Sequence, residues 1–180
     1  MRNVVFTAIV GLALAATPAF AKSAKKPTVR PMSDQTFVTK AAAGGLAEVD
    51  LGKLAQEKGA SQQVKSFGKR MVDDHSRAND ELKALAKSKN ITLPADLDTH
   101  DRAEHDRLAK LSGAAFDRAY MRAMLTDHRE DVNEFRHEST TGKDTDIKAF
   151  ASKTLPTLED HLKMAQDTNR AVGTSGKAKS

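Results

Sequence analysis

Apolar residues recur every three or four positions through four long stretches of this chain, and this spacing most constrains the fold. It matches the 3.6-residue turn of an α-helix that lies on a hydrophobic core. No stretch alternates apolar and polar residues between turn residues, as a half-buried strand would. The pattern therefore predicts an all-α protein with long helices at residues 34–58, 61–89, 113–138 and 145–171.

The lengths of the joins between these helices predict how they are arranged. Four amphipathic helices bury their apolar faces by forming a four-helix bundle. The short joins at 59–61 and 139–144 predict two antiparallel hairpins. The long middle join holds a shorter amphipathic segment at 99–111, which predicts a helical crossover of the ferritin-like kind. A helix lying across one end of the bundle is the alternative.

Two residues predict local irregularities in these helices. Pro156 lies inside the last helical stretch, where proline removes a backbone hydrogen bond. A kink is favoured because the apolar stripe continues past it; the alternative is that one helix ends there and another begins. Gly59 is expected to end the first helix in a left-handed conformation.

The N-terminus has the pattern of a secretory signal. A positive start, an apolar run over residues 4–16 and the small-x-small triplet Ala19-Phe20-Ala21 predict cleavage after Ala21 and export, in our interpretation to the periplasm. The run is shorter than the ~20 residues of a membrane span, so no transmembrane segment is expected after processing. A retained N-terminal anchor is the alternative. The expected organisation is a signal peptide at 1–21, a basic flexible leader at 22–32, the bundle at 33–171 and a flexible tail at 172–180.

The net charge of +5 is concentrated at the ends of the chain. Residues 32–170 carry 22 basic and 24 acidic residues, a formal charge of −2. The folded body is therefore not a basic surface, and we expect no nucleic-acid partner. The basic ends have the charge for weak contact with envelope polymers or anionic lipid, although solvated termini explain them as well. Protein partners are not indicated.

The residue types available limit the chemistry of any site. There is no cysteine, which excludes disulfides, thiolate zinc sites and iron–sulfur clusters. Any metal must be held by histidine, aspartate, glutamate or methionine. No glycine-rich phosphate loop, nucleophile elbow or His-Glu-x-x-His motif occurs, so whether the chain is an enzyme stays open.

Each predicted bundle helix carries one ionisable residue in the middle of its apolar stripe: Glu48, His75, His128 and His161. Such groups are costly in a core unless they are paired or bind a metal. Counted from the loops, the four lie at similar depths along the bundle. Three imidazoles and one carboxylate suit a transition metal such as zinc, iron, manganese or copper. The alternative is a metal-free polar layer that fixes the register of the helices in an interaction or envelope-stress module.

Other polar residues are candidates for supporting this layer. Each of the three histidines follows an aspartate, and neighbours on a helix point ~100° apart, so each aspartate would serve a histidine of an adjacent helix. Surface acids are the alternative for any one of them. The candidates for supporting hydrogen bonds are Asp74, Asp127, Asp160, Asn79 and Asp131.

Methionines share helix faces with the three histidines. Met71 and Met124 each lie four residues before a histidine, and Met164 lies three after one. Thioethers beside imidazoles would favour copper. Methionine as ordinary core filler is the alternative.

Several segments together resemble the domain of unknown function 4142 family. They are the stretch around Gly44-Gly45-Leu46-Ala47-Glu48, the stretch Met71-Val72-Asp73-Asp74-His75, the segment from Ser112 to His128, and the segment from Lys153 to His161. The resemblance covers roughly residues 33–170. It implies an exported, ferritin-like helical bundle without an established activity, and the family's recurrent glutamate and three histidines map onto Glu48, His75, His128 and His161.

Overall fold

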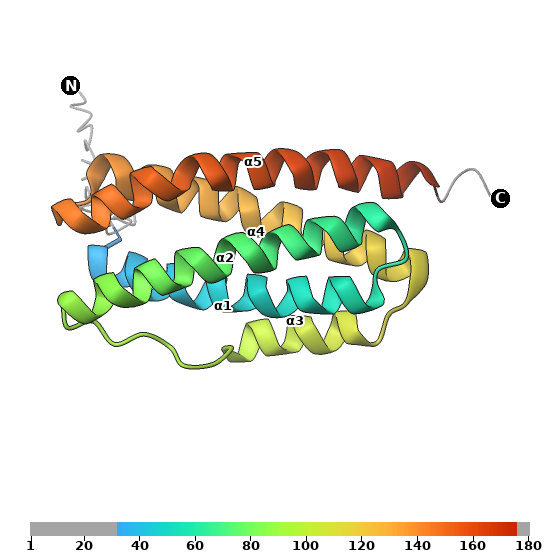
Figure 1. Ribbon diagram of the computed structural model, residues 1–180, viewed down its shortest axis with the longest axis horizontal. Helices are drawn as coiled ribbons and strands as arrows, with labels where there is room; N and C mark the ends of the chain where they lie inside the picture. The colour runs from blue at the N-terminus through green and yellow to red at the C-terminus, as the bar shows by residue number, and fades with distance from the viewer. Residues whose placement is uncertain (1–31, 176–180) are drawn as a thin grey trace, which may run out of the picture. The chain divides into compact units, whose positions relative to one another are not determined.

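The computed structural model describes residues 32–175, and every regular element in this range is an α-helix (Figure 1). The prediction of an all-α protein is therefore confirmed. The expected export signal at 1–21, most of the basic leader and the end of the tail lie outside the described residues. The helices are α1 (Asp34–Lys58), α2 (Gln62–Ser88), α3 (Thr99–Ala109), α4 (Gly113–Thr141) and α5 (Thr145–Ser175).

Side-chain caps explain where several helices begin. The Ser33 hydroxyl accepts a hydrogen bond from the backbone N–H of Thr36, and Ser61 accepts one from Val64. Each cap satisfies a backbone donor that the first turn leaves without a partner. The left-handed end predicted at Gly59 is wrong, because its φ is −56°. Glycine fits there because a Cβ atom would lie 2.6 Å from the carbonyl oxygen of Ala55.

The four long helices form two hairpins that pack against each other. Helix α1 pairs with α2 and α4 pairs with α5, and the hairpins meet where α2 contacts α5 and α1 contacts α4. The join between α2 and α4 runs back along the bundle, with α3 beside α1 (Figure 1). The crossover prediction thus describes the join, and the alternative of a helix across one end is wrong. Two contacts hold α3: Leu108 is fully buried and the His105 ring meets the Asp50 carboxylate.

The last helix is longer than its sequence pattern predicts. Helix α5 continues through Pro156, so the interpretation that one helix ends there and another begins is wrong. It also extends to Ser175, past residue 171 where the helix was expected to end and into the segment expected to be a flexible tail.

A polar layer divides the core of the bundle into two hydrophobic clusters. On α1, Phe37 and Val38 belong to one cluster and Leu51 and Leu54 to the other, and Glu48 lies between them in the chain. The other long helices repeat this order with His75, His128 and His161 between their two groups of buried apolar residues. Each large apolar side chain buried in either cluster contributes ~1.5–3 kcal/mol. The clusters stabilise the bundle, and the polar layer has to be explained separately.

Candidate metal centre

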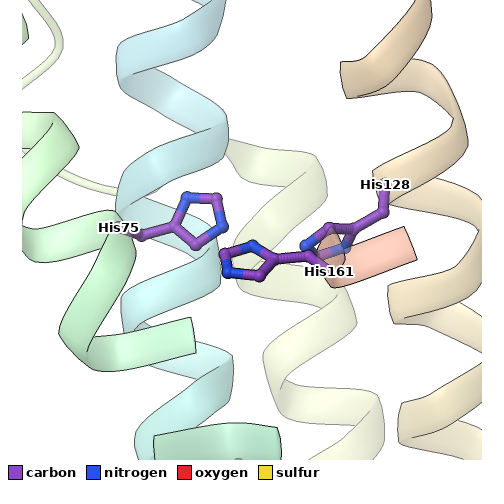
Figure 2. A group of neighbouring side chains, drawn as sticks. All are labelled: His75, His128 and His161. Atoms are coloured by element: carbon purple, nitrogen blue, oxygen red, sulfur yellow. The ribbon is translucent and has the colours of Figure 1, made fainter. Parts of the chain in front are cut away.

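The three stripe histidines meet in the polar layer. His75 comes from α2, His128 from α4 and His161 from α5, and they are 7%, 0% and 1% exposed. The centroids of their rings lie 5.4–5.8 Å apart. One ring nitrogen of each lies within 4.8 Å of those of the other two, and Figure 2 shows the rings turned toward one another. The periodicity that buries each stripe therefore brings three imidazoles to one place.

A backbone hydrogen bond determines the tautomer of His128. Its Nδ1 lies 2.9 Å from the carbonyl oxygen of Met124, one helical turn earlier. Since a carbonyl only accepts, Nδ1 carries the proton and donates it. The lone pair is then on Nε2, which is buried and has no hydrogen-bond partner.

A carboxylate determines the tautomer of His161. Its Nε2 lies 2.8 Å from Oδ2 of Asp74 on the adjacent helix α2. Burial alone would raise the pKa of Asp74, but hydrogen bonds from Arg70 and His161 outweigh it and hold the pKa below its ordinary value. Asp74 is therefore ionised and accepts, so Nε2 donates and the lone pair of His161 is on Nδ1. That Nδ1 is also buried without a partner.

The third histidine adds another free nitrogen, since His75 Nε2 is buried and lacks a hydrogen-bond partner. Buried polar atoms are nearly always hydrogen-bonded, and three unpartnered ring nitrogens in one cluster are an exception that requires an explanation. Ligand nitrogens around zinc at ~2.0–2.1 Å lie ~3.4 Å apart, so side chains already within 4.8 Å need only small adjustments to share an ion. The donor set fits a transition metal.

Burial keeps the three imidazoles neutral. It lowers the pKa of His75 well below the usual value, and the neighbouring His128 and His161 lower it further. Burial also lowers the pKa of His128. It brings the pKa of His161 to about 4, although the hydrogen bond to Asp74 opposes the shift. Metals bind neutral imidazole, so these shifts keep the nitrogen lone pairs available at mildly acidic pH.

Glu48 lies beside the trihistidine cluster and does not belong to it. Its Oε1 is 3.3 Å from Nδ1 of His128, the nitrogen that donates to Met124. Both of its carboxylate oxygens are buried without a hydrogen-bond partner. Burial, with a smaller effect from Asp127, raises the pKa of Glu48 well above its usual value. The expected convergence of four groups on one point is thus replaced by three nitrogens, with a carboxyl group next to one of them.

The residues expected to support the layer have different environments. Asp74 bonds His161 across helices, as the Asp-His pattern predicts. Asp131 and Asn79 line a small cavity of about 20 Å³ together with His75, and Asp127 lies half-buried in a pocket that Glu48 also lines. Asp160 is exposed and does not reach the cluster. Proximity in sequence to a histidine is therefore not enough to predict contact.

The methionines lie in the hydrophobic core around the layer. Met71 and Met124 are fully buried in the cluster that contains Phe67. Met164 is part-buried and packs against the same cluster. The ring of Phe67 lies 6.1 Å from the ring of His128, measured between centroids.

Two arginines that we did not single out in the sequence hold the supporting aspartate. Arg70 and Arg77 both pair with Asp74 from positions four before and three after it on α2. This spacing is typical of ion pairs along a helix and is present in the sequence. A second missed pattern is a row of acids on α4 with helical spacing: Asp127, Glu130, Asp131 and Glu134.

Comparisons with known proteins agree with this architecture. A DUF305 fragment from Deinococcus radiodurans is 15% identical with a TM-score of 0.67, covering 81% of this chain and 99% of that one. CopM in its Cu(II)-bound form is 17% identical with a TM-score of 0.67, covering 79% and 99%. Its Ag-bound form is 18% identical with a TM-score of 0.65, covering 79% and 98%. At such low identities these likenesses show the fold alone.

No curated protein matches the chain. The family model described as a domain of unknown function (DUF4142) matches residues 17–168. That match spans most of the 180 residues and includes the three histidines, Glu48 and all five helices except the end of α5. The chain therefore belongs to the DUF4142 family.

Proposed function

We propose that this protein binds one transition-metal ion through His75, His128 and His161 and serves metal handling or an oxidative-stress role in the periplasm. The observation that carries the proposal is a set of three buried, neutral imidazoles that each have a ring nitrogen within 4.8 Å of the other two and each have one ring nitrogen without a hydrogen-bond partner. A polar layer that only fixed helix register would be expected to satisfy its own hydrogen bonds.

The surrounding residues act by orienting the ligands. Asp74 accepts the Nε2 proton of His161 and so directs Nδ1 of this ring toward the cluster. The carbonyl of Met124 does the same for His128. An ion held by three imidazoles keeps a further coordination position for water or a small ligand. No reaction is assigned to the site.

Imidazole nitrogen suits zinc, copper and iron better than manganese, for which oxygen ligands are preferred. Copper has additional support, because CopM shares the fold and is known with Cu(II), Cu(I) and Ag bound. Under the copper hypothesis, Met71 or Met124 would add a thioether ligand. A Met71→Leu/Met124→Leu variant should then bind Cu(I) more weakly than the wild type, and equal binding would reject a role for the thioethers.

Export rests on the predicted cleavage after Ala21. Among the described residues, no helix combines the length and apolarity that a membrane span requires. N-terminal sequencing of the protein recovered from a periplasmic fraction tests the export step. A chain that begins at Lys22 is the expected result, and an intact Met1 in the membrane fraction would support the retained anchor instead.

Elemental analysis tests the metal proposal. Protein purified from periplasm, or reconstituted with Zn²⁺ or Cu²⁺ and desalted, should hold about one equivalent of metal, and a His75→Gln/His161→Gln variant should hold little. An Asp160→Asn variant, which changes an exposed acid beside His161, serves as the matched control. Less than a tenth of an equivalent in the reconstituted wild type would defeat the proposal and favour the metal-free layer.

A further inference from the structure

A pocket of about 150 Å³ lies between α1 and α4, on the side of the polar layer where Glu48 is found. Small residues create it: Gly44 and Ala47 on α1 face the acidic row of α4. A Cβ atom at Gly44 would be 3.9 Å from its nearest neighbour, Oδ1 of Asp131, an ordinary van der Waals contact, so a small side chain fits there without a clash. The pocket exists because α1 has little side-chain volume opposite the acids.

The lining of the pocket is strongly acidic. It contains five carboxyl groups, on Glu48, Asp127, Glu130, Asp131 and Glu134, and a single cation, Lys40. Lys40 is already paired with Glu134. Within residues 32–175, no basic side chain forms an ion pair with Asp127, Glu130 or Asp131. Like charges this close destabilise a fold unless something compensates them.

Glu48 is the second observation that points to a ligand. Its side chain lines the pocket, the residue is 3% exposed, and neither carboxylate oxygen has a hydrogen-bond partner. A buried carboxyl group without partners is costly. Glu48 would not share an ion with the trihistidine cluster through this contact, because the His128 nitrogen 3.3 Å from it carries a proton.

We propose that this pocket is a second cation site, separate from the trihistidine centre, which takes a hard divalent cation such as Mn²⁺, Ca²⁺ or Mg²⁺ through Glu48, Asp127 and Asp131. The acidic groups of the lining offer only oxygen, which these cations prefer, whereas the histidine cluster offers nitrogen. At ~30 Å³ per water, the pocket has room for an ion that keeps some of its hydration shell. The cation would supply the compensating charge and give Glu48 a partner.

Manganese is the practical probe, because the paramagnetic resonance signal of free Mn²⁺ falls as the ion binds. The full chain in the His75→Gln/His161→Gln background, which disables the trihistidine centre, should bind one Mn²⁺ as tightly as the wild type does. Adding Asp127→Asn and Asp131→Asn should weaken this binding at least tenfold. A Glu159→Gln variant, which changes an exposed acid paired with Arg136 on the surface, should leave it unchanged.

A Gly44→Leu variant fills the pocket without altering its charge, and it should also weaken Mn²⁺ binding at least tenfold. Titration of Ca²⁺ and Mg²⁺ against bound Mn²⁺ ranks the three cations. Equal Mn²⁺ binding by the Asp127/Asp131 variant, or loss of Mn²⁺ in the histidine variant alone, would overturn the second site. Because zinc or copper loading of the wild type is measured separately, failure of the trihistidine proposal and failure of this one give different results.

Discussion

The trihistidine centre and the acidic pocket lie next to each other in one layer of the bundle, yet they differ in almost every chemical respect. The centre is closed, neutral and offers nitrogen, and its three residues are at most 7% exposed. The pocket is open to solvent, acidic and offers oxygen. His128 separates them, with Nδ1 near Glu48 and the unpartnered Nε2 available to the cluster.

This difference follows from how each region offsets the free-energy cost of burying polar groups. An imidazole can lose its proton and enter the core as a neutral group, so three of them pack together at moderate cost. A carboxyl group that loses its proton becomes charged, so crowded acids need solvent, a proton or a cation. The small residues opposite the acids leave them that access. A fall in pH should consequently destabilise the protein through the histidine centre and stabilise it through the acidic pocket.

The largest expected effect comes from replacing a ligand of the centre with an apolar residue. A His75→Leu substitution should weaken Zn²⁺ or Cu²⁺ binding more than ~100-fold, beyond the 10–100-fold typical of the groups that support ligands. The metal-free variant should nevertheless unfold at a higher temperature, because an unpartnered buried nitrogen is removed. Metal titration and thermal unfolding with chelator measure the two effects. If the metal-free variant instead loses as much stability as Leu82→Ala does, the layer is structural.

The second effect is the acid sensitivity of the centre. The pKa of His161 is about 4 in the folded protein and ~6.5 in the unfolded chain, so the unfolded state binds more protons between these values. Neutral His161 contributes roughly 3 kcal/mol to the free energy of unfolding. This contribution is fully present above pH 6.5 and is lost as pH falls toward 4. Urea unfolding of metal-free protein at several pH values, compared with His161→Gln, isolates this slope. Parallel curves for the two proteins would show that His161 is not buried in its neutral form.

Much of the fold could be predicted from the sequence because its determinants are local. The spacing of apolar residues and the capping serines give α1 and α2 bounds within one residue of those predicted. The end of α5 is different: the helix was expected to end at residue 171, but it continues through Gly173 to Ser175. Propensity at one position does not decide whether a terminal turn forms.

The site was harder to predict because it depends on which helix faces which. Asp74 and Asp160 both precede a histidine, but Asp74 lies where α2 meets α5 and Asp160 points to solvent. Glu48 shares the layer with the histidines, yet its rotation about α1 directs it to the pocket. Sequence spacing gives the depth of a residue along a bundle, and only packing gives its direction.

A smaller effect is expected from the residue that orients His161. Asp74→Asn should weaken metal binding 10–100-fold, because an amide supports the Nε2 proton less well than a carboxylate. The neighbouring Asp73→Asn is a matched control, since the Asp73 side chain is 45% exposed and that of Asp74 only 6%. Isothermal titration with Zn²⁺ compares the two variants. Similar affinities for both variants would show that Asp74 only pairs with Arg70 and Arg77 and does not support His161 as a ligand.

The smallest effect concerns Asp131, where protonation should act in the opposite sense to His161. Burial, opposed by His128 and reinforced by Glu48, raises the pKa of Asp131 to about 7, so the folded state binds more protons than the unfolded chain between pH 4 and 7. Stability is therefore lost as pH rises through this window. Asp131→Asn should stabilise the metal-free protein by about 1–2 kcal/mol at pH 8, after allowance for solvent screening, and have little effect at pH 4.

The same variant also separates a proton effect from a cation effect in the pocket. Millimolar Mn²⁺ should raise the unfolding temperature of the wild type at pH 8, because a ligand that binds only the folded state stabilises it. It should raise that of Asp131→Asn much less, since one carboxylate of the proposed site is gone. Equal stabilisation of both proteins by Mn²⁺ would mean that the acids are relieved by solvent and protons alone. The nitrogen centre and the oxygen pocket would then differ only in how deeply they are buried, and the pocket would hold no second ion.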